Sequence, residues 1–179
     1  RSDSSAASDV YKRQIKTISD LKGKKVGFSV GGFEEALLSG MLQKYNLNMS
    51  DVDLVNINFS LSPSLIAKKV DAVIGAFRNF ELNQMDIVNH PGRAFYPEEH
   101  GVPTYEELIY IANQKNKNNP LFDKFFSAIQ KATLTIINDP VSTWKDFSSY
   151  RKGLDDELNK RAYKDTCLLY TSPSPRDST

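Results

Sequence analysis

The chain contains 179 residues, of which 40% are hydrophobic, and 23 Lys and Arg oppose 22 Asp and Glu for a net charge of +1. This length corresponds to about one domain, and the nearly balanced charge argues against a nucleic-acid or polyanion partner. The single cysteine excludes a disulfide framework within the chain, and two histidines are too few for most zinc sites. No apolar run is long enough to span a membrane, and neither end is typical of a signal peptide. The composition indicates no metal and no cofactor.

The two ends of the chain have a relation that is visible at the level of DNA. The segment DVYKRQ (9–14) can be encoded by GAT GTG TAT AAG AGA CAG, and the reverse complement, read from its second base, encodes CLLYT (167–171). Inverted copies at both ends resemble the transposase adapters of sequencing libraries. We therefore expect residues 1–14 and 167–179 to be adapter-derived and disordered, so that Cys167 is not native. Residues 15–166 are then expected to be a truncated piece of a longer protein.

Strand and helix signals alternate through the first half of the chain. Residues 26–29 form a short apolar strand, Val30-Gly31-Gly32 supplies a turn, and residues 33–45 have helical spacing. Residues 52–58 alternate as a second strand, and residues 70–76 form a third run rich in β-branched side chains, typical of a strand buried on both faces.

Two further helices complete this pattern. The first is predicted over residues 64–69, with Ser62 as its N-cap and Pro63 at its first position, and the second over residues 82–88, ended by His90-Pro91-Gly92. The order strand, helix, strand, helix, strand, helix predicts an α/β fold with a mostly parallel sheet and helices on both faces.

The second half of the chain is predicted to be mainly helical. Residues 97–103 have no period and are interpreted as a crossover or lid, whereas residues 108–112 form an apolar run typical of a strand. A polar loop then precedes an amphipathic helix whose phenylalanine stripe is expected in a core. The three helices are predicted over residues 121–136, 140–150 and 154–163.

Polar and aromatic residues follow the third predicted strand in the order Phe77, Arg78, Asn79, Phe80 and Glu81. In an open α/β sheet, ligands lie outside the carboxyl ends of the strands, so this cluster is a candidate binding site. The alternative is local, because an asparagine can cap the next helix and a glutamate in its first turn is favoured by the helix dipole.

The glycine turn before the first helix is a second candidate. Paired glycines let a backbone approach a ligand closely, and the helix start offers free N–H groups. The alternative is a turn that simply needed glycine, and Glu34 and Glu35 would disfavour a phosphate there.

Three segments carry a resemblance to a known family: DLKGKKVGFSVGGFEEALL, NFSLSPSLIAKKVDAVIGAFRNFELNQ and GRAFYPEEHGVPTYEELIYIAN. They resemble the periplasmic substrate-binding proteins of ABC transporters, within the ThiY-like branch that binds thiamine pyrimidine precursors such as formylaminopyrimidine. The resemblance implies a type II periplasmic-binding-protein fold, in which two α/β lobes close on the ligand. Residues 15–103 would be the second lobe and hinge, and residues 104–166 the C-terminal return to a first lobe that is mostly missing.

The resemblance also implies roles for the candidate residues. Glu81 would accept a hydrogen bond from the exocyclic amine of an aminopyrimidine and from the ring N–H if the ring is protonated, and Asn79 would add a second bond. Aromatic rings would stack on the ligand, with Phe77 as a further candidate, and Arg78 would face solvent or pair with Glu99. The expected ligand-binding residues are Glu81, Asn79, Gly31, Gly32, Phe33, Phe80 and Tyr96.

The implied protein is a monomeric binding protein without enzymatic activity. It would act in the periplasm, or outside the cell on a lipid anchor, and deliver its ligand to an ABC permease and ATPase. One alternative is a binder of a sulfonate, nitrate or aromatic acid, which would favour basic or hydroxyl donors at residues 32–35. The other is the pyrimidine synthase of thiamine biosynthesis, which has the same fold and uses pyridoxal phosphate. That enzyme resembles these proteins but has a cysteine-rich motif where this chain has residues 102–106, which contain no cysteine. His100 and the lobe outside this chain leave the alternative open.

Overall fold

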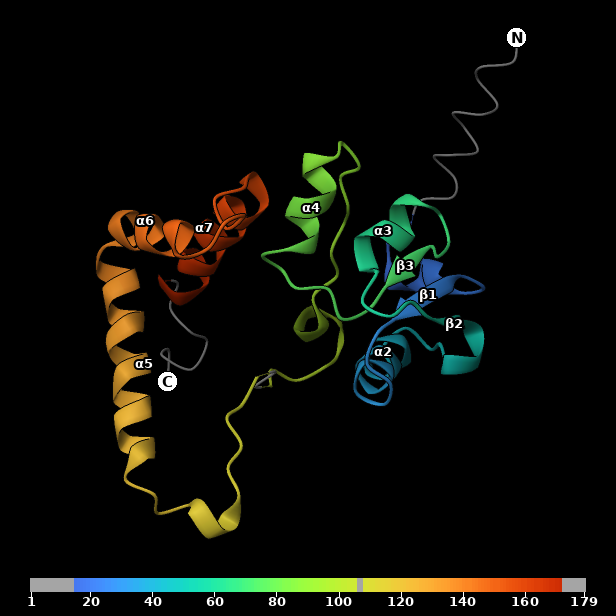
Figure 1. The fold of residues 1–179 in the computed structure, drawn as a ribbon. Helices are drawn as coiled ribbons and strands as arrows, with labels where there is room; N and C mark the ends of the chain where they lie inside the picture. The colour runs from blue at the N-terminus through green and yellow to red at the C-terminus, as the bar shows by residue number, and fades with distance from the viewer. Residues whose placement is uncertain (1–14, 106–107, 172–179) are drawn as a thin grey trace. The chain divides into compact units, whose positions relative to one another are not determined.

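The structure is a computed structural model that describes residues 15–105 and 108–171. The described residues divide into two compact units, the first ending at Tyr105 and the second formed by the rest. The first unit contains every strand assigned in the described residues, and the second is helical (Figure 1). The expected boundary at residue 103 between a second lobe and a return to a first lobe stays a prediction.

The first unit contains a sheet of three parallel strands. These are β1 (Lys25–Phe28), β2 (Asp53–Asn56) and β3 (Ala72–Val73), in the spatial order β2-β1-β3. Lys25 lies opposite Asp53, and Val26 lies opposite Ala72. The parallel pairing confirms the sheet type that the alternating sequence pattern predicted.

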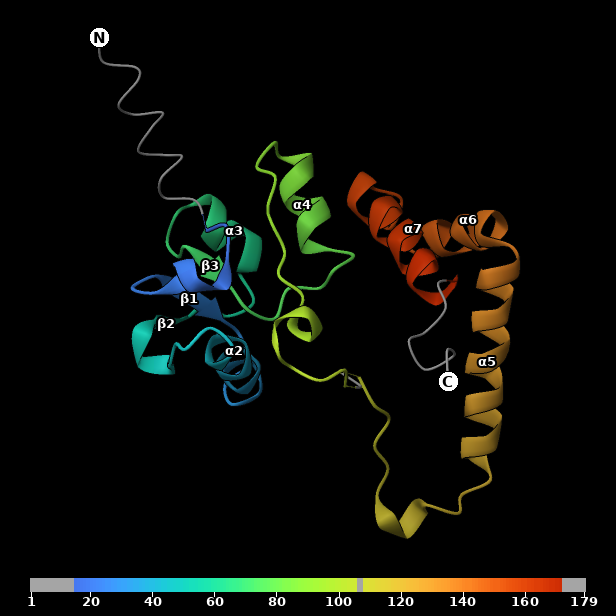
Figure 2. The same cartoon turned by 180° about the vertical axis from the view of Figure 1, so that it is seen from behind.

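Helices cover both faces of this sheet. The chain passes from β1 through α2 (Phe33–Gln43) to β2, and then through α3 (Leu61–Ile66) across to β3 on the other side of β1. Because such crossovers are right-handed, this reversal of direction places α2 and α3 on opposite faces (Figures 1 and 2). The predicted α/β fold with helices on both faces is confirmed.

The core lies between β1 and α2. Val26 on β1 and Leu38, Met41 and Leu42 on α2 are buried, and the spacing of the helix residues places them on one face. The short helix η1 (Ile18–Leu21) contributes both of its end residues, and Leu47 precedes η2 (Met49–Asp51). Burying each such side chain stabilises the fold by about 1.5–3 kcal/mol.

The third strand is shorter than the sequence predicted. Of residues 70–76, only Ala72 and Val73 form β3, and both are half-buried rather than enclosed on both faces. The strand lies at an edge of the sheet, and Gly75 ends its extended course with a φ of +90°. The prediction of a doubly buried strand was therefore wrong in this chain.

The helix before β3 starts earlier than predicted. It begins at Leu61 rather than Ser64, its N-cap is Ser60 rather than Ser62, and Pro63 is its third residue. Ser62 is buried instead of capping. The helix after β3, α4 (Glu81–Ile87), has nearly the predicted bounds.

The segment after α4 docks on the end of α2. Residues 97–103 were expected to have no helical turn, but η3 (Pro97–His100) forms because Pro97 fixes the first φ and Gly101 ends the turn at a φ of +98°. The Tyr45 hydroxyl lies 2.7 Å from Nδ1 of His100, whose ring also packs edge-on against Phe95.

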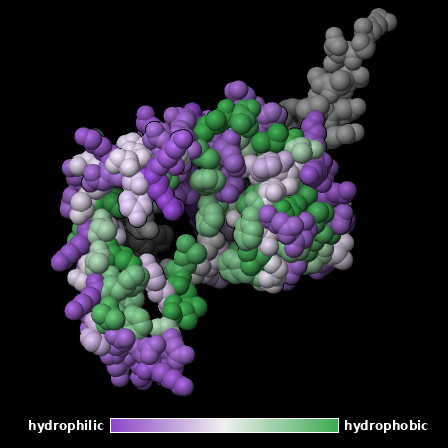
Figure 3. Space-filling model, viewed as in Figure 1, coloured by the Kyte–Doolittle hydropathy of each residue, from purple (hydrophilic) through white to green (hydrophobic). Residues whose placement is uncertain are grey.

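The predicted strand at residues 108–112 is not formed. Residues 108–113 are extended but pair with no strand of the described residues. Leu108, Ile109, Tyr110 and Ile111 are 67–86% exposed, and strongly hydrophobic atoms gather over this part of the chain in Figure 3. A strand needs a partner for its backbone groups, so sequence propensity alone did not produce one.

The second unit consists of the turn η4 (Gln114–Asn116) and the helices α5 (Leu121–Asn138), α6 (Pro140–Tyr150) and α7 (Glu157–Thr171). Helix α5 confirms the amphipathic pattern, but its phenylalanine stripe is not a closed core. Phe125 and Phe126 are 46% and 45% exposed, and both contact the Tyr110 ring with centroids 5.5 Å apart.

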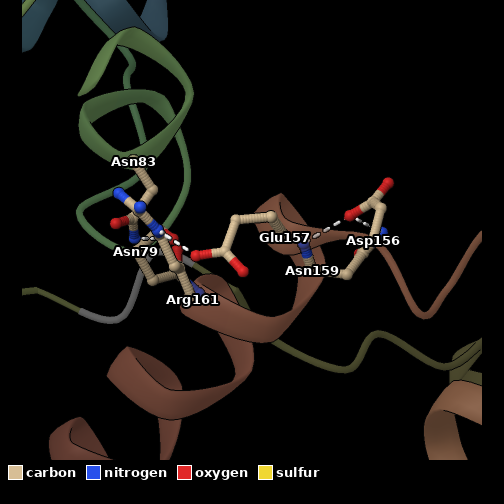
Figure 4. Close-up of polar contacts among 6 residues, drawn as sticks. All are labelled: Asn79, Asn83, Asp156, Glu157, Asn159 and Arg161. Atoms are coloured by element: carbon tan, nitrogen blue, oxygen red, sulfur yellow. Dashed lines mark hydrogen bonds and ion pairs between the residues drawn. The ribbon is translucent and has the colours of Figure 1, made fainter. Parts of the chain in front are cut away.

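Local capping and packing determine the ends of the last two helices. The Asp139 side chain accepts a hydrogen bond from the Ser142 N–H at the start of α6, and the Tyr163 hydroxyl of α7 lies 2.6 Å from Oγ1 of Thr143. An ion pair of 2.7 Å joins Arg161 to Glu157 one turn earlier (Figure 4). Helix α7 continues to Thr171, past residue 166, where the sequence predicted that ordered structure ends.

Candidate ligand-binding site

The strand order gives the sheet a switch point between β1 and β3. The chain leaves β1 toward one side and later returns to the other, so the loops after β1 and β3 turn in opposite directions from neighbouring strands. Ligands of open α/β sheets bind at such a position. The glycine turn follows β1, and the cluster from Phe77 to Glu81 follows β3. The topology therefore places both sequence-predicted candidates at the carboxyl ends of neighbouring parallel strands.

The turn after β1 is held by two carboxylates. Gly32 has a φ of +83°, and its N–H donates to Oε2 of Glu35 over 3.0 Å. The Ser29 N–H donates to Oε2 of Glu34 over 2.7 Å. Both amides are therefore already paired, so neither is free to bind an anion.

Glu34 also connects the two loops of the switch point. Its side chain is only 5% exposed and packs against Gly75, the residue that follows β3. A Cβ at Gly75 would lie 2.5 Å from the carboxyl carbon of Glu34, so only glycine allows this contact. The sequence pattern did not predict this role of Glu34. The feature that could have indicated it is a glycine shortly after one strand together with an acidic residue at the start of the helix that follows another.

Glu81 lies at the first position of α4 and is half-buried. Its Oε2 accepts a hydrogen bond of 2.7 Å from the Phe77 N–H. Burial raises the pKa of the Glu81 carboxyl, although backbone hydrogen bonds from Phe77 and from its own N–H act in the opposite direction. The N-cap of α4 is Phe80 and not Asn79, so the simple capping role for Asn79 is wrong.

Asn79 is a half-buried residue in the same loop. Its backbone carbonyl accepts a hydrogen bond of 3.1 Å from the side-chain amide of Asn83 (Figure 4). This contact ties the loop to α4 one turn further on. The loop therefore presents Asn79 and Glu81 from a fixed backbone.

Arg78 holds Tyr96 beside this loop. Its guanidinium forms an ion pair of 2.5 Å with Glu98 and lies 4.2 Å from the centroid of the Tyr96 ring. Arg78 is exposed, as one predicted alternative had it, but its ion-pair partner is Glu98 and not the predicted Glu99. Burial raises the pKa of the Glu98 carboxyl, but the hydrogen bond and charge of Arg78 outweigh this effect and lower it overall.

Each of the three loops at this edge presents an exposed apolar side chain. Val30 follows β1, Phe59 follows β2 and Phe77 follows β3. Phe33 at the start of α2 is also exposed and contacts Tyr105 edge-on, with centroids 5.8 Å apart. The sequence predicted the rings near β1 and β3 but missed Phe59.

A hollow lies within the second unit. It has a volume of about 400 Å³ and is mainly apolar. Its lining residues come from α5, α6 and α7, and they include Ile136, Ile137, Phe147 and Tyr163. The hollow contains none of the predicted site residues.

No group of three or more His, Cys, Asp or Glu residues that could hold a metal ion occurs in residues 15–105 and 108–171. Within the same described ranges, no helix is both long enough and apolar enough to cross a bilayer.

The parallel sheet with helices on both faces is an α/β fold of the periplasmic-binding-protein-like type. The structure of the alkanesulfonate-binding protein SsuA from Xanthomonas axonopodis pv. citri, bound to MOPS, shares this fold. The two superpose with a TM-score of 0.60 at 18% identity, over 86% of this chain and 51% of that one.

The chain belongs to the NMT1/THI5-like family, which matches residues 5–143. A Haemophilus influenzae protein described as a thiamine biosynthesis protein is 48% identical over 166 residues, covering 92% of this chain and 52% of that protein. A formylaminopyrimidine-binding protein of Halalkalibacterium halodurans is 28% identical over 123 residues, covering 68% and 37%. A 4-amino-5-hydroxymethyl-2-methylpyrimidine phosphate synthase of Saccharomyces cerevisiae is 27% identical over 165 residues, covering 86% and 48%.

The chain spans about half the length of the Haemophilus and yeast relatives that it matches. The family match begins at residue 5, inside the segment expected to come from an adapter. The origin of residues 1–14 and 167–179 therefore stays a prediction.

Proposed function

We propose that this chain is part of the solute-binding component of an ABC importer and captures a thiamine pyrimidine precursor, an aminopyrimidine, between two lobes. The observation that carries the proposal is the half-buried carboxylate of Glu81 beside the switch point of the sheet. The similarity to a formylaminopyrimidine-binding protein and to a thiamine biosynthesis protein supports this choice of ligand.

The chemistry of Glu81 suits an aminopyrimidine. The Phe77 N–H donates to Oε2 of Glu81 over 2.7 Å, and the N–H of Glu81 itself is the other backbone group that acts on this carboxyl. One edge of the ligand offers an amine donor next to a ring nitrogen, so the carboxylate accepts from the amine and shares a proton with the ring. The raised pKa of Glu81 favours such sharing, because burial makes this carboxylate bind a proton more tightly than an exposed glutamate does.

The other predicted residues would complete half of a pocket. Asn79 supplies a second hydrogen bond, and Phe80, with Phe77 next to it, offers apolar ring surface. Tyr96 has one face under Arg78, so its other face is the one that could meet a ligand. Gly31, Gly32 and Phe33 form the opposite wall at the start of α2.

In this proposal the protein is a monomer that performs no catalysis. It acts in the periplasm, or on a lipid anchor outside the cell. Its two lobes close on the ligand by a hinge motion, and the closed protein then delivers the ligand to the permease and ATPase. The synthase relatives are the alternative, and His100 is the residue that would favour it. His100, however, bonds to Tyr45 and packs against Phe95, which gives it a structural role.

A sulfonate or nitrate ligand is less compatible with this edge. Such an anion needs N–H donors at the start of α2, and the amides of Ser29 and Gly32 already donate to Glu34 and Glu35. Two carboxylates beside the site would also repel an anion.

Calorimetry of the full-length protein with formylaminopyrimidine, hydroxymethylpyrimidine and taurine tests the proposal. We expect both pyrimidines to bind and taurine not to. Glu81→Gln should weaken pyrimidine binding by roughly 10- to 100-fold, because it replaces a charge-assisted hydrogen bond by a neutral one. The matched control is Glu99→Gln, an exposed carboxyl in the same unit, which should bind normally. Unchanged affinity in Glu81→Gln would exclude the assigned role.

A further inference from the structure

The loop after β2 has an unusual backbone. Two consecutive residues, Asn58 and Phe59, have left-handed φ values of +47° and +62°. Asparagine tolerates this region, but a phenylalanine there is a genuine outlier. Strained residues of this kind persist only where the surrounding structure holds them, and they cluster at ligand-binding sites.

Hydrogen bonds hold the strained turn against the end of β1. The Ile57 N–H donates to the Phe28 carbonyl over 2.9 Å, and the Ser60 N–H donates to the Ile57 carbonyl over 2.9 Å. Between them, the Phe59 N–H donates to Oγ of Ser29 over 3.2 Å. The conformation of Phe59 is therefore fixed by the same residue whose N–H binds Glu34.

The Phe59 ring is 74% exposed. Packing within the first unit therefore does not explain the choice of residue. Asparagine or glycine at this φ would remove the strain, and any polar side chain would be better solvated. Phenylalanine is unfavourable here both in its backbone conformation and in its exposure to water. We therefore infer that its ring contacts something other than the first unit.

We propose that Phe59 is a specificity-determining residue of the ligand site, which contacts the substituent that neighbours the amine of the aminopyrimidine. The inference rests on the proposed function. Strands β2 and β3 lie two strand spacings apart, about 10 Å, so Phe59 and the loop carrying Glu81 flank the switch-point edge from opposite sides. A ring held at its amine edge by Glu81 carries its variable substituent on the carbon next to the amine, so this substituent extends sideways along the edge, where Val30 and Phe59 are the exposed apolar side chains of the neighbouring loops.

The test separates the contribution of the ring from that of the backbone. Phe59→Asn removes the ring and suits a left-handed φ, whereas Phe59→Tyr keeps the ring. The control is Lys68→Asn, because Lys68 is also exposed and left-handed, with a φ of +55°, at the opposite end of α3. Calorimetry of the full-length variants with formylaminopyrimidine and with hydroxymethylpyrimidine, which has the shorter substituent, gives the readout.

We expect Phe59→Asn to weaken formylaminopyrimidine binding about tenfold and hydroxymethylpyrimidine binding less than about threefold. The longer substituent loses more apolar contact when the ring is removed. Phe59→Tyr and Lys68→Asn should bind both ligands normally, and both Asn variants should unfold at equal or higher temperature. Unchanged affinity in Phe59→Asn, or an equal loss for both ligands, would overturn the inference. If the wild-type protein binds neither pyrimidine, the proposed function itself fails.

Discussion

Glu81 makes the stability of the unliganded protein fall as the pH rises. Burial raises the pKa of its carboxyl above the usual value of 4.5, against the effect of the Phe77 N–H. The folded state then binds the proton more tightly than the unfolded state, so stability declines from pH 4.5 upward through the raised folded pKa. We expect Glu81→Gln to remove this decline from the free energy of unfolding, measured in urea at several pH values.

The matched control for this experiment is again Glu99→Gln. It removes one exposed negative charge from the same unit and leaves Glu81 in place, so it should keep the decline of the free energy of unfolding that the wild-type protein shows with rising pH. A constant difference between wild type and Glu81→Gln across the range would show that the Glu81 pKa is not raised.

At the scale of single residues, the sequence predicted what depends on residue type and chain position. Glu81, Asn79 and the Gly31-Gly32 turn follow strands β3 and β1, as the sequence predicted, and their role in binding stays a prediction. Glu34 was taken only as a repulsive charge, because its burial depends on Gly75, which is distant in the sequence. Phe59 was not predicted, because no residue pattern indicates that a phenylalanine has a left-handed φ.

At the scale of elements, Glu34 couples helix α2 to the loop after β3. We expect Gly75→Ala to destabilise the fold by roughly 3 kcal/mol, combining a left-handed penalty with the clash against Glu34. In a Glu34→Ala background the clash is absent, so the cost should fall to roughly 1–2 kcal/mol. Urea denaturation of the four proteins in this double-mutant cycle gives the coupling energy.

Gly23→Ala is the matched control for this cycle. Gly23 has a φ of +70°, but a Cβ there meets no atom within 4 Å, so it reports the left-handed penalty alone. Its cost should be the same with and without Glu34. Additive effects of Gly75→Ala and Glu34→Ala would show that the two loops are not coupled through this contact.

Helices were the elements that the sequence predicted best. Their periodicity is local, and α2, α4, α5 and α6 have nearly the expected bounds. Strands depend on partners, so β3 is shorter than expected and residues 108–112 form no strand. The start of α3 was misplaced because Ser60 and Ser62 are equally plausible caps by residue type.

At the scale of the whole molecule, the segment from Leu108 to Ile111 is an exposed apolar run that pairs with no strand of the described residues. Its side chains have strand propensity, and the chain spans only about half the length of relatives such as the Haemophilus protein. We expect these residues to pair as a strand with the first lobe of the full-length protein. Their amides should then exchange with deuterium roughly 100-fold more slowly than in the isolated chain, because exchange would need a cooperative opening.

The amides of Val26 and Phe28 in β1 are the internal control, since this strand already has parallel neighbours on both sides. They should exchange at the same rate in both proteins. Equally fast exchange of Leu108 and Ile111 in the full-length protein would show that the apolar run is not a strand there. Slow amide exchange in the full-length protein alone would show that this segment forms a strand there. The sequence would then have predicted the strand correctly, and its hydrogen-bond partners would lie outside the described residues.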